Sequence, residues 1–180
     1  MRGPAPASGE FSRQPEMALF AFLETLGVPF QTFLHPPVAT VAESREVKIG
    51  VEGAHTKNLF LKDGKGEMAL VSASADSALP LNRLHRTIGT QRLSFTDAGL
   101  LWEVLGVTPG SVSGFALLND APPRVRFVLD KALLAFDTLN FHPLRNDMTT
   151  SLRRDDFLSF VMATGHDVLT VDFIKLAALE

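Results

Sequence analysis

The chain has 180 residues, 46% of them hydrophobic and 21% charged, with no cysteine and a formal net charge of -3. These values are typical of one globular domain, and they exclude disulfides, thiolate metal sites and a cysteine nucleophile. The negative charge argues against general binding to DNA or other polyanions, so any RNA contact must use a local basic patch. No apolar run approaches the ~18 residues of a membrane span. We therefore expect a cytoplasmic protein without a membrane partner.

Residues 1–14 are rich in Pro, Gly, Ser and Ala, which predicts a flexible tail before a single domain at 15–180. In chain order the pattern predicts a helix at 15–26, a strand at 30–34, a helix at 41–49, strands at 56–63 and 67–74, helices at 82–88 and 97–105, strands at 112–118 and 125–129, a helix at 155–163 and a strand at 168–173.

Capping residues support these helices. Pro15 can begin the first one, and glycines at 27, 89 and 106 stand where helices end. N-terminal caps are expected from Thr40 with Glu43, from Thr96 or Asp97, and from Asp155 or Asp156.

The strands come in pairs with helices between them. The first pair has a hairpin signal at 63–66, and the second turns at 119–123. Neither a strict alternation of strand and helix nor an internal repeat is present. The sequence therefore predicts a single α+β domain in which helices flank a mixed, curled and barrel-like sheet.

Several familiar motifs fail on inspection. The glycines at 64–69 match a dinucleotide fingerprint, but a strand follows them where that fingerprint needs a helix. The segment 110–114 resembles a nucleophile elbow, yet Val112 occupies the position that must be serine. The five histidines are scattered, so a zinc helix is unsupported. We expect no metal and no cofactor, and no conventional catalytic triad.

The stretch 53–63 is the most informative. Side chains alternate across a strand, so Lys57 shares a face with Leu59 and Leu61, while Asn58 lies on the other face. A lysine on an apolar face near a strand start is a candidate for binding an anion. Alternation alone favours the plainer alternative, in which its stem packs and its amine reaches water.

Two further segments combine polar and apolar residues. In 108–115, two glycines allow a ligand to approach the backbone, whose N–H groups can hold a carbonyl or phosphate oxygen; a tight turn before a strand is the alternative. In 140–150, His142, Asn146 and three threonine or asparagine neighbours surround apolar residues. Without context this segment predicts only a loop before a strand.

Together the three segments resemble one family. The letters HTKNLFLKD at 55–63, LGVTPGSVSGFALLND at 105–120 and NFHPLRNDMTTSL at 140–152 are similar to those of the YbaK-type aminoacyl-tRNA deacylases. These are related to the editing insertion of bacterial prolyl-tRNA synthetases. The resemblance covers about 17–173, and it is nearest to the free-standing branch that acts on alanyl-tRNA with the proline anticodon.

The resemblance implies roles for particular residues. Lys57 is expected to be the catalytic residue, near the terminal nucleotide and the ester, and Gly110 to begin the loop that holds the aminoacyl group. His142 is expected in the same pocket. The full set of expected substrate-binding residues is Asn58, Gly110, Ser111, Val112, Ser113, Gly114, Phe115, His142 and Asn146. The family commonly has proline at the position of Gly114, so proline is expected to fit there.

The expected reaction is hydrolysis of alanine from mischarged proline tRNA, with prolyl-tRNA synthetase as a further partner. The family mechanism uses the neighbouring ribose hydroxyl, which accounts for the lack of a protein nucleophile. Phosphate contacts are expected among Arg83, Arg86, Arg92, Arg145, Arg153 and Arg154, each of which is also explained as a surface charge. The alternatives are removal of cysteine or another small residue, a non-catalytic aminoacyl-tRNA binding module, and an unrelated small-molecule hydrolase.

Overall fold

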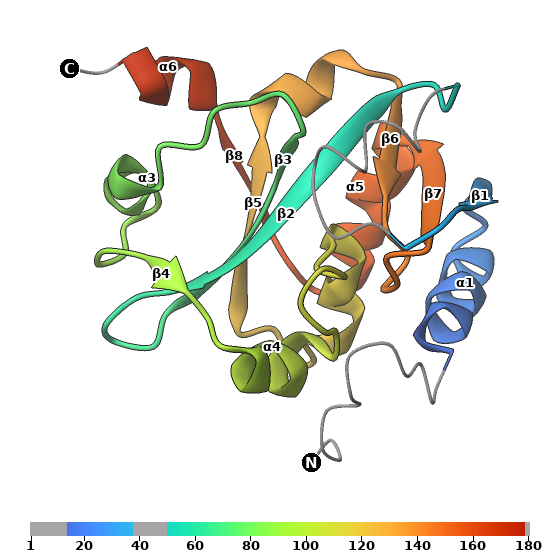
Figure 1. Ribbon diagram of the computed structural model, residues 1–180, viewed down its shortest axis with the longest axis horizontal. Helices are drawn as coiled ribbons and strands as arrows, with labels where there is room; N and C mark the ends of the chain where they lie inside the picture. Colours follow the sequence, from blue (N-terminus) through green and yellow to red (C-terminus); the bar gives the residue numbers. More distant parts are fainter. Residues whose placement is uncertain (1–13, 38–49, 179–180) are drawn as a thin grey trace.

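The computed structural model describes residues 14–37 and 50–178 (Figure 1). Most of the predicted tail and the whole predicted helix at 41–49 lie outside these ranges. The elements are α1 Pro15–Thr25, β1 Phe30–Leu34, β2 Ala54–Lys62, β3 Met68–Ser74, α3 Leu81–Ile88, β4 Ser94–Phe95, α4 Ala98–Leu105, η1 Gly114–Asn119, β5 Val125–Asp130, η2 Lys131–Ala135, β6 Thr138–Phe141, β7 Met148–Arg153, α5 Arg154–Ala163, β8 Val168–Val171 and α6 Phe173–Ala178. None of the helices in the described ranges is long and apolar enough to cross a membrane.

The eight strands of the described ranges join one mixed sheet in the order β1-β7-β6-β2-β3-β5-β8, with β4 paired to β2 at the side of this path. β2 and β3 form the predicted antiparallel hairpin. β5 runs parallel to both β3 and β8, and β6 runs parallel to the start of β2. Helices flank the sheet, so the predicted α+β class with a mixed sheet is confirmed.

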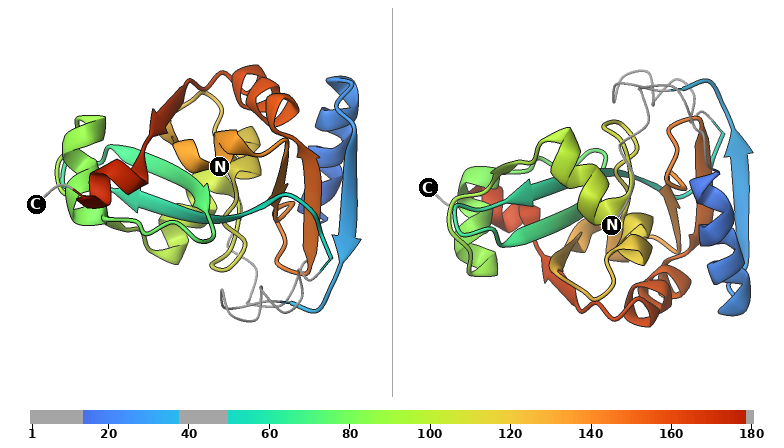
Figure 2. Two further views of the ribbon diagram at one scale, coloured as in Figure 1. Left: turned by 90° about the horizontal axis from the view of Figure 1, so that it is seen from above. Right: turned by 90° about the horizontal axis from the view of Figure 1, so that it is seen from below.

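Two apolar clusters lie on opposite faces of β2, β3 and β5. The smaller joins Leu61 and Val71 to α3 and α6, and the larger joins Phe60 and Leu70 to α1, α4, η1 and α5. Figure 1 shows α3 and α6 at one end of the molecule and α1 with β1 at the other. The views from above and below show the long β2–β3 hairpin reaching from the first end toward the second (Figure 2).

The local signals that specify these elements are the ones found in the sequence. Pro15 occupies the start of α1, and Gly27, Gly89 and Gly106 all have positive φ just after helices. The Asp97 carboxylate accepts a hydrogen bond from the Leu100 N–H and caps α4. The hairpin turn at 63–66 also forms as predicted, with the Gly66 N–H donating to the Asp63 carbonyl.

The strand predicted at 112–118 is wrong. Gly114–Asn119 is instead the 3₁₀ helix η1, which begins where the Ser113 hydroxyl accepts a hydrogen bond from the Phe115 N–H. Phe115, Ala116 and Leu117 are all buried. A short continuous apolar run does not distinguish a buried strand from a buried helical turn, which explains the error. The predicted hairpin between 112–118 and 125–129 is therefore absent, and β5 pairs with β3 and β8.

Three smaller expectations also need correction. The predicted loop at 140–150 contains an antiparallel pair, β6 with β7. The strand predicted at 168–173 ends at Val171, and Phe173 begins α6. Neither Asp155 nor Asp156 caps α5, since Arg153 occupies the cap position and both aspartates lie in the first turn. An acidic first turn is favourable there because the helix dipole is positive at that end.

A buried pair of hydrogen-bonded side chains joins the end of η1 to the segment after α5. The Asp120 carboxylate lies 3.0 Å from His166 Nε2 and accepts hydrogen bonds from the Arg124 and Val125 N–H groups. The Thr164 hydroxyl donates to the Val161 carbonyl and so accepts from His166 Nδ1–H. Burial alone would raise the pKa of Asp120, but the hydrogen bonds from His166 and the backbone hold that pKa below its usual range.

This pair predicts how stability depends on pH. Because the folded pKa of Asp120 lies below the unfolded value of about 3.9, its contribution is present above that value and is lost as the pH falls through the folded pKa. Asp120→Asn should lower the free energy of unfolding by about 3 kcal/mol at neutral pH. Urea titrations should show this difference shrinking below about pH 4.

The matched control is Asp155→Asn, whose carboxylate is exposed and pairs with the neighbouring Arg154. It should change the free energy of unfolding by less than about 0.5 kcal/mol. A difference between the wild type and Asp120→Asn that stays constant from neutral to acidic pH would refute a role for the ionised carboxylate.

Candidate active site

β2 carries the two neighbouring residues of the strongest motif. The two apolar clusters confirm the predicted alternation, since Leu61 belongs to the cluster with α3 and α6 while Phe60 belongs to the cluster with η1 and α5. Lys57 and Asn58 therefore lie on opposite faces of the sheet. A ligand that contacts both residues must reach the edge of the strand between them.

The structure provides such an edge. One side of β2 pairs with β3 from Thr56 to Lys62. The other side pairs with β6 at Ala54 and His55 and with β4 at Leu61 and Lys62. Among the strands in the described ranges, none pairs with that second side between these two contacts. Lys57 and Asn58 both lie in this interval.

On the Asn58 face, a row of hydrogen bonds crosses three strands. The Ser72 hydroxyl donates to Asn58 Oδ1 at 2.6 Å, Asn58 Nδ2 donates to the Thr56 hydroxyl at 3.3 Å, and that hydroxyl donates to the Asn140 carbonyl at 2.8 Å. These bonds hold the Asn58 amide in one orientation. The expected binding residue is thus fixed beside the end of β6, where the segment with His142 begins.

On the opposite face, the Lys57 amine is directed toward the segment that follows β3. Its Nζ donates to the Ala75 carbonyl at 3.2 Å and to the Ser77 carbonyl. Both of these acceptors are neutral backbone oxygens of the segment that follows β3.

The predicted glycine loop adjoins the Asn58 face. Gly110 is exposed and has φ of 88°, a conformation that favours glycine. A Cβ built on it would lie 3.8 Å from Asn146 Nδ2, so the two predicted loops meet here. Ser111, Ser113, Gly114 and Phe115 are buried, and Val112 is half-buried against the larger apolar cluster. From Gly110 to Phe115, Gly110 is the exposed residue, and Pro109 before it is exposed as well.

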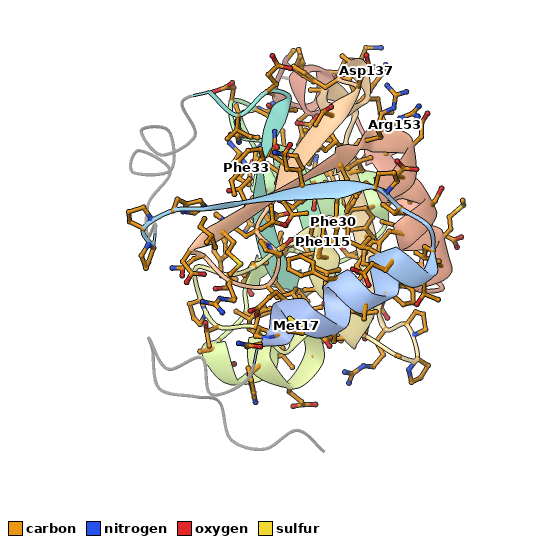
Figure 3. All side chains as sticks on the ribbon, turned by 90° about the vertical axis from the view of Figure 1, so that its right-hand side faces the viewer. Met17, Phe30, Phe33, Phe115, Asp137 and Arg153 are labelled. Atoms are coloured by element: carbon orange, nitrogen blue, oxygen red, sulfur yellow. The ribbon has the colours of Figure 1, made fainter. Side chains whose placement is uncertain are left out.

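Phe115 supports the loop from the core. Its ring packs against Phe141, Phe157 and Phe160 with centroid distances of 5.3, 5.9 and 5.3 Å. Figure 3 places Phe115 inside the molecule, viewed from the side of β1 with Phe30 and Phe33.

The segment from His142 to Asp147 is tightly folded. The Leu144 N–H donates to the His142 carbonyl at 2.9 Å, and Leu144 has φ of 66°, which is rare for a residue other than glycine. His142 Nδ1 donates to the Met148 carbonyl at 2.7 Å and therefore carries a proton. The buried Leu144 side chain and these bonds fix the orientation of His142 and place Asn146 against Gly110.

A family model for the aminoacyl-tRNA editing domain matches residues 35–160, which span β2, the glycine loop and the His142 segment. The chain belongs to this family. It is an aminoacyl-tRNA deacylase, and aminoacyl-tRNA is its substrate. The predicted resemblance to the YbaK-type editing enzymes is confirmed.

Relatives of this editing domain cover nearly the whole chain. Prolyl-tRNA synthetase associated domain-containing protein 1 of Bos taurus is 38% identical over 163 residues, which are 88% of this chain and 95% of that protein. The prolyl-tRNA editing protein ProX of Acetoanaerobium sticklandii is 34% identical over 158 residues, 87% of this chain and 96% of that protein.

Solved structures share the fold. One described as a candidate trans-editing enzyme for prolyl-tRNA synthetase superposes with a TM-score of 0.69 at 21% identity, covering 89% of this chain and 98% of that chain. The hypothetical protein APE2540 superposes with a TM-score of 0.66 at 23% identity, covering 85% and 97%.

The structure of this editing domain also reveals contacts that sequence reasoning missed. Arg145 binds both oxygens of Asp147, at 2.9 and 2.6 Å, and its third nitrogen binds the buried Glu16 of α1 at 2.9 Å. The hydrogen bond from Arg145, opposed by burial, holds the pKa of Asp147 below its usual range. These ion pairs tie α1 to the segment that carries His142. A contact between residues 129 positions apart leaves no local signal in the sequence.

A second histidine lies beside the first. The rings of His35 and His142 have centroids 5.8 Å apart, and His35 Nε2 is 3.0 Å from the Thr149 hydroxyl. The His35 N–H also donates to the Asp147 carbonyl. His35 therefore packs directly against a predicted site residue, although its isolated position in the sequence gave it no functional signal.

Half of the arginines proposed for phosphate contacts have roles in the fold. Arg83 donates to two carbonyls at the end of α6, Arg154 donates to the Leu134 carbonyl, and Arg145 forms the ion pairs above. Arg86, Arg92 and Arg153 are exposed. A phosphate backbone could contact these three arginines without breaking a hydrogen bond that stabilises the fold.

The structure leaves little room for the expected proline at position 114. A Cβ built on Gly114 would lie 2.8 Å from Phe157 Cζ, 3.0 Å from Ser72 Oγ and 3.2 Å from Phe141 Cε1. The Phe157 ring cannot swing aside freely, because it stacks on Phe141 with centroids 4.2 Å apart. Glycine here permits η1 to pack closely on β3 and β6.

We therefore predict that Gly114→Ala and Gly114→Pro lower the free energy of unfolding by about 1–3 kcal/mol through overpacking. Gly64→Ala is the control, since its Cβ would meet only the mobile end of the Gln91 side chain. Urea titration measures both. Full stability of Gly114→Pro would show that the aromatic cluster can adjust.

Proposed function

We propose that this chain hydrolyses alanine from mischarged proline tRNA and so edits, in trans, an error of prolyl-tRNA synthetase in the cytoplasm. The observation that most directly supports this proposal is that the Gly110 loop meets Asn146 of the His142–Asn146 segment. Both lie near the part of β2 that has no strand partner on its second side in the described ranges. The names of its relatives, which refer to prolyl-tRNA editing and to prolyl-tRNA synthetase, support the choice of tRNA.

The proposed mechanism needs no protein nucleophile. The amino acid is attached to the terminal ribose by an activated ester, and its hydrolysis requires a placed water, a proton acceptor and stabilisation of the oxyanion. The adjacent ribose hydroxyl assists the proton transfer. The Lys57 ammonium group supplies positive charge, and backbone N–H groups of the Gly110 loop supply donors to the substrate. His142 shapes the pocket rather than acting as the general base.

One arrangement in the fold resembles a hydrolase triad and is better explained as structural. Thr164, His166 and Asp120 are linked by hydrogen bonds, but both the His166 and Asp120 side chains are buried. The Thr164 hydroxyl donates to a backbone carbonyl and not to the imidazole. This geometry argues against the alternative of an unrelated small-molecule hydrolase.

Selection by size explains why a second enzyme is needed. A synthetase pocket built for proline cannot strongly reject the smaller alanine, because each lost methylene changes binding by only about 1–3 kcal/mol. A deacylase site that admits alanine and excludes the pyrrolidine ring corrects this error. We place its walls at the Gly110–Phe115 segment and the residues around His142, which are held rigid by the aromatic cluster and the Arg145 ion pairs.

The direct test charges one proline tRNA in turn with alanine, cysteine, serine and proline and measures release with catalytic amounts of protein. We expect rapid release of alanine and little release of proline. Lys57→Ala should fold normally and reduce the rate about a hundredfold, as loss of one oxyanion-stabilising group does.

Each other outcome identifies a different function. A preference for cysteine would assign the chain to the sister activity, and binding without turnover would make it an aminoacyl-tRNA binding module. Equal release of alanine and proline would end the size-exclusion mechanism.

The loop role of Gly110 can be separated from its effect on stability. Gly110→Ala forces a side chain into φ of 88° with only an ordinary contact to Asn146 Nδ2 at 3.8 Å, and Gly66→Ala forces one into the same φ in the distant hairpin turn, where nothing lies within 4 Å. Both should lose about 1 kcal/mol of stability. Only Gly110→Ala should slow deacylation, in assays at equal concentrations of folded protein. Equal activity of the two variants would show that the Gly110 loop is not part of the active site.

A further inference from the structure

We infer that Asp130 and Ser77 are positioning residues for Lys57, acting through the backbone of residues 74–77, which we call the 74–77 turn. This inference rests on the proposed role of Lys57 in deacylation. It assigns a function to a buried acid at the end of β5 and to a serine that no sequence motif includes.

First, the 74–77 turn holds the Lys57 amine by hydrogen bonds. Lys57 Nζ donates to the Ala75 and Ser77 carbonyls, both of which belong to the 74–77 turn. A lysine has four rotatable bonds, so without such contacts its ammonium group would sample many positions. Two acceptors on one short segment fix where the charge lies.

Second, the Asp130 carboxylate holds the 74–77 turn by hydrogen bonds. One carboxylate oxygen of Asp130 accepts hydrogen bonds from the Ser74 N–H at 3.1 Å and from the Ser77 hydroxyl. The other oxygen accepts from the Ala132 N–H at 3.0 Å and caps η2. Asp130 is 1% exposed, so water does not compete with these bonds. The pairing of β5 with β3 sets the carboxylate beside the end of β3.

Ser77 connects the two steps within one residue. Its hydroxyl binds Asp130, and its carbonyl binds the Lys57 ammonium group. Loss of the hydroxyl therefore removes the bond that fixes the position of the Ser77 carbonyl. The carbonyl itself is still present as an acceptor for Lys57. The Ser77 N–H also donates to the Ser74 carbonyl at 3.0 Å, so the turn can still close without the serine hydroxyl.

The variants follow from this geometry. Ser77→Ala removes only the link to the carboxylate, and Ser77→Thr restores a hydroxyl. Asp130→Asn places an amide N–H₂ group against either the turn or the η2 cap, so one of those two sets of bonds must break. Ser94→Ala is the control, because its hydroxyl makes a long 3.4 Å contact on the exposed strand β4.

The first readout needs no tRNA. In protein labelled with ¹⁵N-lysine, a hydrogen-bonded ammonium group exchanges its protons slowly and gives a resolved signal, which Lys57→Arg identifies by its disappearance. We expect this signal in the wild type, in Ser77→Thr and in Ser94→Ala, and its broadening in Ser77→Ala and Asp130→Asn. An unchanged signal in both of the last two variants would overturn the inference.

The second readout is single-turnover release of alanine from mischarged proline tRNA. Ser77→Ala should reduce the maximal rate about tenfold with the half-saturating enzyme concentration changed less than about twofold, because the charge is misplaced but still present. Ser77→Thr should recover the rate. A lost ammonium signal with an unchanged rate would also overturn the inference. Full activity of Lys57→Ala would instead refute the proposed catalytic role of Lys57, and the ammonium signal would still test the positioning.

Discussion

The alternation of side chains along β2 is the constraint on which the site depends. A strand presents successive residues to opposite faces, so the adjacent residues Lys57 and Asn58 cannot point into the same side of the sheet. The fold resolves this by leaving one edge of β2 without a strand partner between the contacts with β6 and β4 in the described part of the chain. A substrate placed at that edge can meet the lysine on one side and the asparagine with the glycine loop on the other.

Buried and half-buried carboxylates stabilise the segments around this edge. Asp63 holds the hairpin turn and the Gln91 N–H, Asp120 joins η1 to His166, Asp130 holds the 74–77 turn, and Asp147 binds Arg145. Each accepts several N–H or O–H donors, which offsets the cost of removing its charge from water. Asp63 and Asp120 end two of the family motifs, so those motifs contain structural residues as well as residues proposed for chemistry.

Local signals predicted much of the fold. Pro15, Gly27 and Asp97 mark helix ends in the structure as in the sequence, and the β2–β3 hairpin forms where the Asp63–Gly66 turn predicted it. The errors lie where contacts between residues far apart in the sequence determine the secondary structure. Residues 115–118 are uniformly apolar because η1 packs Phe115, Ala116 and Leu117 into the core. β6 depends on a parallel pairing with β2, more than 80 residues earlier in the chain.

The same distinction applies to the site. Lys57, Gly110 and His142 could be predicted as candidate site residues, because they lie within motifs that resemble those of the family. Glu16, His35, Ser77 and Asp130 could not, because each acts on the site through a residue far away in the sequence. A sequence motif identifies candidate residues, but it does not show which backbone segment binds a lysine amine.

The central claim is that the β2 edge, the Gly110 loop and the His142 segment form one site for an aminoacylated ribose. It can be tested with adenosine whose ribose carries alanine through a stable amide, added to ¹⁵N-labelled protein while backbone amide resonances are followed. The account predicts saturable shifts concentrated at 56–58, 110–115 and 142–147. Shifts concentrated instead around His166 and β8, with these three segments unaffected, would contradict it.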